Sequence, residues 1–309
     1  MNSKTLLYIS KRIALAILTV WVVITITFFV SHAVPGGPFA SEKAITPAAQ
    51  AALEAKYGLD KPLFEQYTTY LTDIVTDFDF GPSLKNRGRD VIDVIGDGMA
   101  TSAKLGISAA SIALVLGVVF GSVAALRRNQ LIDRVIMVFT TACISMPSFI
   151  MGTLLLILFA IELRILPANG NAAGGLILPI ITLSLSPMAN ITRLTRSSML
   201  DVLGQDYIRT AKAKGVSGNK IIFGHALKNA LIPVITYFGP MLAYIVTGSL
   251  VVEQIFAVPG IGRTFVSSIV DRDYPMIMGT TIVLASLIVI MNMISDILYK
   301  VVDPRINLE

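Results

Sequence analysis

Long uncharged apolar runs constrain this chain more than any other feature. One of them extends from Ile13 to Val30, 18 residues without a single charge. A helix that crosses a bilayer needs about 20 mostly apolar residues. The chain as a whole is 54% hydrophobic and only 15% charged, whereas a soluble domain carries about 25% charged residues. The sequence therefore predicts a membrane protein.

The apolar runs predict an all-α, polytopic membrane domain that occupies the whole chain. Pro147, Pro179, Pro187 and Pro240 fall inside these runs and predict kinks, because a membrane helix tolerates proline where neighbours satisfy the freed carbonyl groups. We expect six transmembrane helices, at residues 11–33, 99–126, 134–161, 176–199, 229–252 and 277–299. The longer polar segments between them are 34–98, 200–228 and 253–276.

The distribution of lysine and arginine predicts the orientation of these spans. The side that holds both termini and segment 200–228 carries 15 basic and 6 acidic residues, and the opposite side carries 10 basic and 14 acidic residues. Cytoplasmic loops of membrane proteins are enriched in Lys and Arg. We therefore expect both termini and segment 200–228 in the cytoplasm, and segments 34–98 and 253–276 on the opposite side of the membrane. The basic pI is thus a topology signal and does not indicate nucleic-acid binding.

The first span has an alternative interpretation as a secretory signal peptide. Lys11 and Arg12 precede the apolar run, and Ser31-His-Ala33 resembles a cleavage site. A signal peptide has an apolar core of about 7–15 residues, which is shorter than this run. We therefore expect a retained span.

The external segment 34–98 predicts two helices. Thr46 and Pro47 are typical of an N-cap and a first helical residue, and Gly58 is typical of a helix end. A second helix is expected after Pro62 and is ended by Phe80-Gly81-Pro82, with one apolar stripe formed by Leu63, Tyr67, Leu71, Ile74 and Phe78. We expect a small helical cap on the span ends, which is compatible with a platform for an external substrate-carrying protein.

Sequence patterns for catalysis are missing. The chain has no Gly-x-x-x-x-Gly-Lys-Ser/Thr phosphate loop, and its two histidines, His32 and His225, are expected on opposite faces of the membrane. Cys143 is the single cysteine, so no disulfide is possible within the chain. We expect no metal site, no bound cofactor and no enzymatic activity, so that energy must come from a partner or from an ion gradient.

Ion-coupled carriers usually hold ionisable residues at mid-membrane depth. Here the charged residues of the spans lie close to span ends, where long side chains reach the interface: Lys104, Arg193, Arg196, Glu253 and Asp296. This distribution argues against a gradient-driven secondary carrier.

A polar helix is predicted in the cytoplasmic segment 200–228. Asp206 is suited to an N-cap, Gly215 to a left-handed helix end, and Lys212 and Lys214 to the negative end of the helix dipole. Ser217 is suited to cap a following helix. A basic loop that fixes topology and touches lipid headgroups is the alternative, but it does not explain a capped, rigid helix. We expect this helix to be offered to a partner protein.

These residues resemble the cytoplasmic signature of permease subunits of bacterial ABC importers. Asp206-Tyr-Ile-Arg-Thr-Ala-Lys-Ala-Lys-Gly215 and His225-Ala-Leu-Lys-Asn-Ala-Leu-Ile-Pro233 are most similar to the di- and oligopeptide branch, in particular to the oligopeptide permease B-type subunit. Arg209 stands where the wider importer signature has a glutamate. Further similar fragments run along the whole chain and include Val34-Pro-Gly-Gly-Pro-Phe39, Ser145-Met-Pro-Ser-Phe149, Phe256-Ala-Val-Pro-Gly-Ile-Gly262 and Arg272-Asp-Tyr-Pro275.

The resemblance implies a type I importer fold in which this chain binds several partners. These are a second homologous permease subunit, two cytosolic ATPase subunits that hold ATP and Mg, an extracytoplasmic peptide-binding protein, and the lipid bilayer of the bacterial plasma (inner) membrane. It also implies an ATPase-coupling helix made of Asp206, Tyr207, Ile208, Arg209, Thr210, Ala211, Lys212, Ala213, Lys214 and Gly215.

The resemblance further suggests an external gate and a translocation path. Pro259, Gly260 and Gly262 would shape the outer end of the path, with a plain turn as the alternative. Hydroxyl residues that are candidates for its lining, or simply small residues at helix contacts, are Ser108, Ser111, Thr182, Ser184, Thr247 and Ser249. The expected cargo is an oligopeptide or dipeptide, and a nickel chelate, murein peptide or opine is the alternative.

Overall fold

The computed structural model describes residues 3–34, 37–39, 47–86 and 88–302, and every regular element in these ranges is helical. Among the described residues, five helices are long and apolar enough to cross a membrane: Ser10–Ala33, Val91–Leu126, Ile177–Leu203, Ile232–Ile255 and Tyr274–Ile294. A bent pair, Leu131–Ser145 with Ser148–Glu162, makes a sixth candidate if it is counted as one span. The chain divides into two compact units.

Unit 1 comprises residues 1–100 and 260–289. Its helices are α1 (Ser3–Ala33), α2 (Pro47–Lys56), α3 (Leu63–Asp77), the first part of α4 (Val91–Leu126), α12 (Ile261–Asp271) and most of α13 (Tyr274–Val302). Its core joins Ile24 and Phe28 of α1 to Tyr67 of α3, and to Val91 and Met276 at the starts of α4 and α13.

The external helices α2 and α3 differ in detail from the sequence prediction. Pro47 is the first residue of α2, and Gly58 (φ 66°) follows its end as expected; Thr46 lies outside the described residues. Helix α3 ends at Asp77, with Phe78 in the left-handed conformation, before the predicted stop at residues 80–82. Within the predicted stripe Tyr67 is buried, whereas Leu63 and Phe78 are exposed by 47% and 76%. The stripe is therefore buried only in its middle.

Asp273 joins the external loop of unit 1 to the start of α13. Its carboxylate accepts hydrogen bonds from the Ser83 hydroxyl (2.5 Å), from the backbone N–H of Leu84 (3.2 Å) and from that of Met276 (3.3 Å). The last of these bonds makes Asp273 the N-cap of α13. Buried to 2% exposure, this single side chain satisfies donors from two distant segments.

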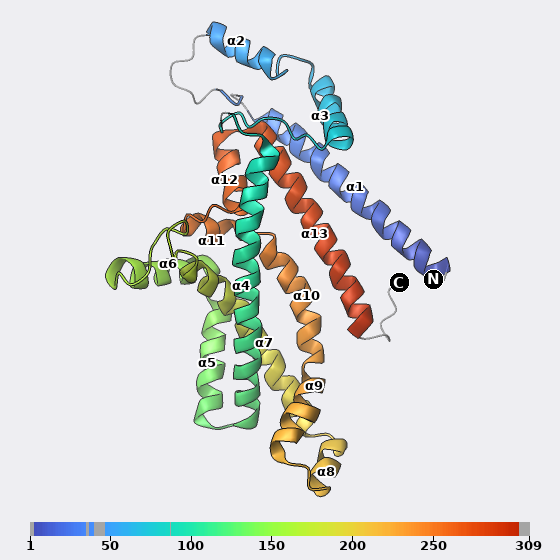
Figure 1. Ribbon diagram of the computed structural model, residues 1–309, viewed down its shortest axis with the longest axis vertical. Helices are drawn as coiled ribbons and strands as arrows, with labels where there is room; N and C mark the ends of the chain where they lie inside the picture. Colours follow the sequence, from blue (N-terminus) through green and yellow to red (C-terminus); the bar gives the residue numbers. More distant parts are fainter. Residues whose placement is uncertain (1–2, 35–36, 40–46, 87, 303–309) are drawn as a thin grey trace. The chain divides into compact units, whose positions relative to one another are not determined.

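Unit 2 comprises residues 101–259 and 290–309. It contains the rest of α4 and α5 (Leu131–Ser145), α6 (Ser148–Leu156), the π-helix η1 (Ile157–Glu162) and α7 (Ile177–Leu203). These are followed by α8 (Asp206–Ala213), the π-helix η2 (Lys220–Ala226), α9 (Leu227–Ala230), α10 (Ile232–Val246) and α11 (Leu250–Ile255). Helices α4 and α5 form a hairpin through a turn in which Asn129 is left-handed (Figure 1).

Prolines shape the helices of unit 2 in different ways. Pro147 separates α5 from α6, which meet at 105°, so the predicted third span is broken rather than kinked. Pro187 and Pro240 lie inside α7 and α10 as expected. Pro179 lies in the first turn of α7, where its missing N–H costs no hydrogen bond, so no kink arises there.

Candidate functional site

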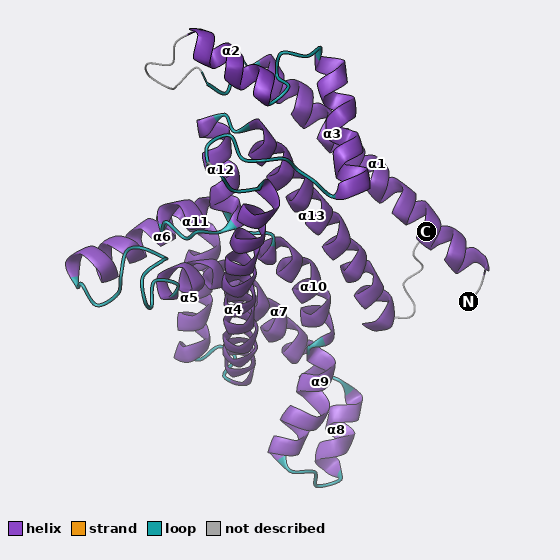
Figure 2. Ribbon diagram, turned by 45° about the horizontal axis from the view of Figure 1, so that its top comes forward, coloured by secondary structure: helices purple, strands orange, loops and turns teal. Residues whose placement is uncertain are grey.

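Helix α8 lies at one end of unit 2, beside the segment that leads into α9 (Figures 1 and 2). Its C-terminal end is closed by two backbone hydrogen bonds, from Gly215 N to Lys212 O (3.0 Å) and from Val216 N to Ala211 O (3.1 Å). Gly215 is left-handed, with φ 74°. These features form a Schellman motif, so Gly215 ends the helix as the sequence predicted.

The start of α8 differs from the prediction. Gln205 occupies the N-cap position, without a side-chain capping bond, and Asp206 is the first helical residue. Asp206 is 95% exposed and lies 3.5 Å from Arg209, one turn along. Its contribution is therefore a negative charge in the first turn, which the helix dipole favours. After α8, the carbonyl of Ser217 accepts the Ile221 N–H (3.0 Å), which places Ser217 at the start of the next helical segment.

One side of α8 is packed into unit 2. Ile208 is fully buried in a cluster with Ala125 of α4, Met199 of α7 and Ile221 of η2, and Ala211 and Val216 pack against this cluster. In addition, Asn229 Nδ2 donates to the Tyr207 hydroxyl (3.0 Å). Helix α8 is thus attached to the ends of several long helices.

The remaining side of α8 is open. The exposed residues are Asp206, Tyr207, Arg209, Thr210, Lys212, Ala213, Lys214 and Gly215. Phe223 of η2, an element in contact with α8, is 68% exposed. The sequence did not single out this aromatic residue, because one phenylalanine in a polar segment gives no sign that it is exposed. A short basic helix with an adjacent aromatic side chain is a surface suited to another protein, since aromatic and basic side chains often anchor protein interfaces.

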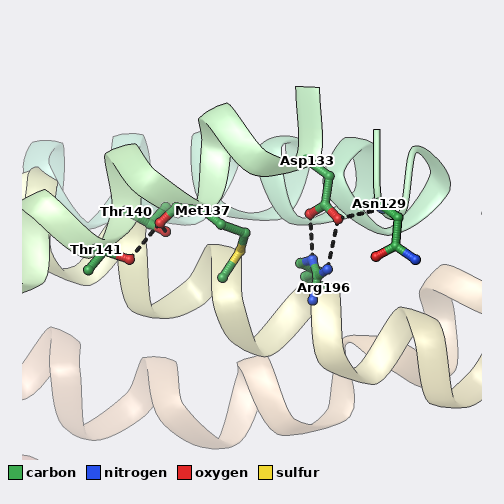
Figure 3. A network of polar contacts seen from close by, with 6 residues as sticks. All are labelled: Asn129, Asp133, Met137, Thr140, Thr141 and Arg196. Atoms are coloured by element: carbon green, nitrogen blue, oxygen red, sulfur yellow. Dashed lines mark hydrogen bonds and ion pairs between the residues drawn. The ribbon is translucent and has the colours of Figure 1, made fainter. Parts of the chain in front are cut away.

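An ion pair braces α7, the helix that leads into α8. Asp133 of α5 accepts two hydrogen bonds from Arg196 of α7, at 2.7 and 2.8 Å, and a third from the backbone N–H of Asn129 at 2.9 Å (Figure 3). Asp133 is 3% exposed. The sequence predicted that Arg196 extends to the membrane interface; the structure instead pairs it in the bidentate geometry that gives the strongest charge-assisted contacts.

Close packing against α4 also holds α7 in place. A Cβ atom added to Gly117 of α4 would lie 2.6 Å from Ile191 Cγ2, and one added to Gly121 would lie 2.5 Å from Thr192 O. These two glycines, four residues apart on one face of α4, let its backbone approach α7 closely. The α4–α5 hairpin and α7 therefore form a tight block that ends at α8.

Glu253 of α11 is completely buried and accepts a hydrogen bond from the Ser102 hydroxyl of α4 (2.7 Å). The sequence placed this carboxylate near a span end, with its side chain reaching the interface. The structure corrects this prediction, because the side chain points into the packing of unit 2. A sequence cannot reveal this contact, since 151 residues separate the two partners.

The predicted gate residues lie at the start of α12. Pro259 is exposed and directly precedes Gly260. Gly260 and Gly262 begin α12 in unit 1, where the Gly260 carbonyl accepts the Thr264 N–H (3.0 Å). Gly98 of α4 approaches the backbone of Gly260 so closely that an added Cβ would lie 3.2 Å from its carbonyl carbon. The two glycines thus take part in helix initiation and close packing.

The six hydroxyl residues that are candidates for a path lining lie in different surroundings. Thr182 and Ser249 line a cavity in unit 2. Ser184 is buried and donates to the Ile181 carbonyl, and Ser111 is exposed and donates to the Ile107 carbonyl. Thr247 is buried and donates to the Tyr244 carbonyl, and Ser108 is half-buried.

Comparisons with known proteins cover nearly the whole chain. Residues 117–308 match the family model described as binding-protein-dependent transport system inner membrane component, and residues 5–95 match the model for the N-terminal part of such membrane components. The dipeptide transport system permease protein DppB of Bacillus subtilis is 48% identical over 97% of this chain and 98% of its own length. The oligopeptide transport system permease protein OppB of Haemophilus influenzae is 44% identical over 97% of this chain and 99% of its own length.

A solved structure shares the fold. A chain of the inward-facing MetNI methionine ABC transporter superposes with a TM-score of 0.54 at 16% identity, covering 68% of this chain and 97% of that chain. The likeness confirms the expected type I importer permease fold.

Proposed function

This chain belongs to the family of binding-protein-dependent transport system inner membrane components, and from that premise we propose that it is the permease subunit of an ATP-driven importer of oligopeptides or dipeptides. Its relatives named for dipeptide and oligopeptide transport match along almost their whole lengths. The proposed complex contains a second homologous permease subunit, two cytosolic ATPase subunits that hold ATP and Mg, and an extracytoplasmic peptide-binding protein.

The observation that carries the mechanism is the two-sided environment of α8. Ile208 anchors one side in the ends of α4, α7 and η2, while Arg209, Lys212 and Lys214 leave the other side open and basic. In the proposed complex α8 sits in a surface groove of one ATPase subunit. ATP-driven closure of the ATPases then displaces α8, and its rigid attachment transmits the displacement to the membrane helices. Such transmission needs a bistable assembly that both ends bias.

Site-directed cross-linking tests the ATPase contact. In a Cys143→Ala background, Arg209→Cys should cross-link to a co-expressed ATPase subunit, because Arg209 is 74% exposed on α8. Arg134→Cys is the matched control, an exposed arginine at the α4–α5 hairpin on the same predicted side of the membrane. Equal cross-linking at both positions, or none at Arg209, would remove the support for coupling through α8.

Reconstitution tests the transport activity. The complete complex in proteoliposomes should take up peptide only with ATP and the binding protein, and this chain alone should take up none. Uptake by the isolated chain under an ion gradient would favour a secondary carrier. Uptake of a nickel chelate or a murein peptide, with no oligopeptide or dipeptide uptake, would favour the alternative cargo.

A further inference from the structure

Four interruptions of helical structure in unit 2 meet at one cavity of about 530 Å³. They are the break before Ser148, the prolines Pro187 in α7 and Pro240 in α10, and the break at Gly248, which has φ 95°. Ser148, both prolines and Gly248 all line the cavity. Irregular backbone at membrane depth is tolerated where it is buried in protein or lines a water-filled cavity. The convergence of four such features on one space indicates a site with a function.

Proline removes a backbone donor from a helix beside this cavity. Pro187 has no N–H group, so the carbonyl of Leu183, four residues earlier in α7, loses its usual helical donor. Leu183 is itself among the lining residues. An uncompensated carbonyl in an apolar surrounding is costly, and a ligand with N–H donors would satisfy it.

The side chains of the cavity are uncharged. Among the described residues that line it, none has a carboxylate, ammonium or guanidinium group. Hydroxyl groups, which both donate and accept hydrogen bonds, come from Ser148, Thr182, Ser186, Tyr237, Tyr244 and Ser249. The other lining residues are apolar. This lining can bind polar groups of either kind without selecting one charge.

The position and size of the cavity suit passage through a membrane. Pro187 lies ten residues after the start of α7 at Ile177, which is about 15 Å at 1.5 Å per residue and about half of the roughly 30 Å hydrocarbon core. The volume falls within the range of about 300–1,000 Å³ that is usual for small-molecule sites.

We propose that this cavity is a transient binding site for the backbone of a short peptide. The Leu183 carbonyl accepts a peptide N–H group, and the hydroxyl groups of the lining bind peptide carbonyls and termini. The proposal rests on the proposed function and deepens it. Since every peptide has the same backbone, recognition of this kind passes varied side chains, and the neutral lining avoids trapping acidic or basic ones.

A single carboxylate placed in the cavity tests the proposal. In the reconstituted complex with its binding protein, Ser186→Asp should shift the ratio of uptake of a lysine-containing over a glutamate-containing tripeptide by about fivefold or more, because a partly desolvated carboxylate attracts an ammonium group and repels another carboxylate. Ser197→Asp is the matched control, because Ser197 is an exposed serine of the same helix that does not line the cavity. This control should leave the ratio unchanged.

Ser186→Cys provides a second measurement that does not depend on transport through the charged variant. In the assembled complex, with Cys143 replaced by alanine, a small hydrophilic thiol reagent should modify the cysteine introduced at position 186. Excess tripeptide under turnover should slow this modification. Two outcomes would overturn the proposal: an unchanged selectivity ratio in an active Ser186→Asp complex, or efficient cross-linking of Ser186→Cys to the second permease subunit with no protection by peptide. A wild-type complex without ATP-dependent uptake would instead contradict the proposed function.

Discussion

Gly215 shows how one residue sets the end of α8. Its left-handed φ of 74° disfavours any residue with a Cβ, yet an added Cβ would meet no atom within 4 Å. The left-handed conformation costs an L-residue about 1–2 kcal/mol, and asparagine tolerates it better than other residues. The constraint at Gly215 therefore lies in the backbone and not in packing.

We expect the ATP-dependent peptide uptake of Gly215 variants to follow the order Gly, Asn, Ala, Val. Gly215→Asn should retain most activity, whereas Gly215→Val should lose most of it, because a frayed helix end absorbs displacement. Gly218→Ala is the control, since this nearby glycine has equal space and no left-handed φ. Equal activity of the asparagine and valine variants in a proteoliposome assay would contradict the mechanism.

The Asp133–Arg196 pair leads to a prediction about stability. Replacing Asp133 with asparagine leaves the Arg196 guanidinium without its counter-charge. Breaking a buried ion pair lowers the free energy of unfolding by about 3–5 kcal/mol. Because the Arg196 side chain is 24% exposed, we expect a loss at or below the lower end of this range. Arg196→Lys keeps the charge, loses the bidentate geometry and should cost less. Thermal unfolding of the detergent-solubilised protein measures both.

A charge-reversed double variant separates attraction from geometry at this pair. Asp133→Arg combined with Arg196→Asp restores opposite charges, but it points an arginine at the Asn129 N–H, which needs an acceptor. The double variant should therefore recover only part of the lost stability. Full recovery would show that the Asn129 hydrogen bond contributes nothing.

At the scale of the element, the contact between α4 and α7 depends on glycine. Gly121→Ala places a methyl group 2.5 Å from Thr192 O and Thr195 Cβ, so the two backbones must separate. Overpacking of this kind costs about 1–3 kcal/mol. The matched control is Gly96→Ala in the same helix, where an added Cβ meets nothing within 4 Å and alanine improves helix propensity by about 1 kcal/mol. The two variants should shift the melting temperature in opposite directions.

Local sequence signals predicted elements well where they act within a few residues. Gly58 and Gly215 mark helix ends because both take positive φ. The start of α4 at Val91, eight residues before the predicted span, escaped notice because Asp93 and Asp97 make that turn polar. The 105° bend at Pro147 was underestimated, since proline alone does not say whether a helix kinks or breaks.

Contacts between distant elements were beyond the reach of the sequence. Arg196 and Glu253 both read as charges near span ends, and each proves to be held by a partner on another helix. Hydropathy reports the depth of a residue in the membrane but not the direction in which it faces. Among the residues that line the candidate cavity, the sequence singled out Thr182 and Ser249 as path candidates and Pro187 and Pro240 as kinks, but it did not predict a cavity, because the lining comes together only in the fold.

At the scale of the whole molecule, the asymmetry of basic charge predicts on which side of the membrane each polar segment between the spans lies. Thr76 of α3 and Ser217 after α8 are both exposed hydroxyl residues of similar size. In a Cys143→Ala background, a membrane-impermeant maleimide should label Thr76→Cys in intact cells and Ser217→Cys only after the membrane is opened. The reverse pattern would place α8 outside the cell, where no ATPase could reach it.

Segment 193–228 alone holds seven of the chain's 25 basic residues. Neutralising its lysines and arginines should therefore make the labelling of Ser217→Cys heterogeneous. Neutralising the three basic residues at the α4–α5 hairpin, Arg127, Arg128 and Arg134, should have a smaller effect.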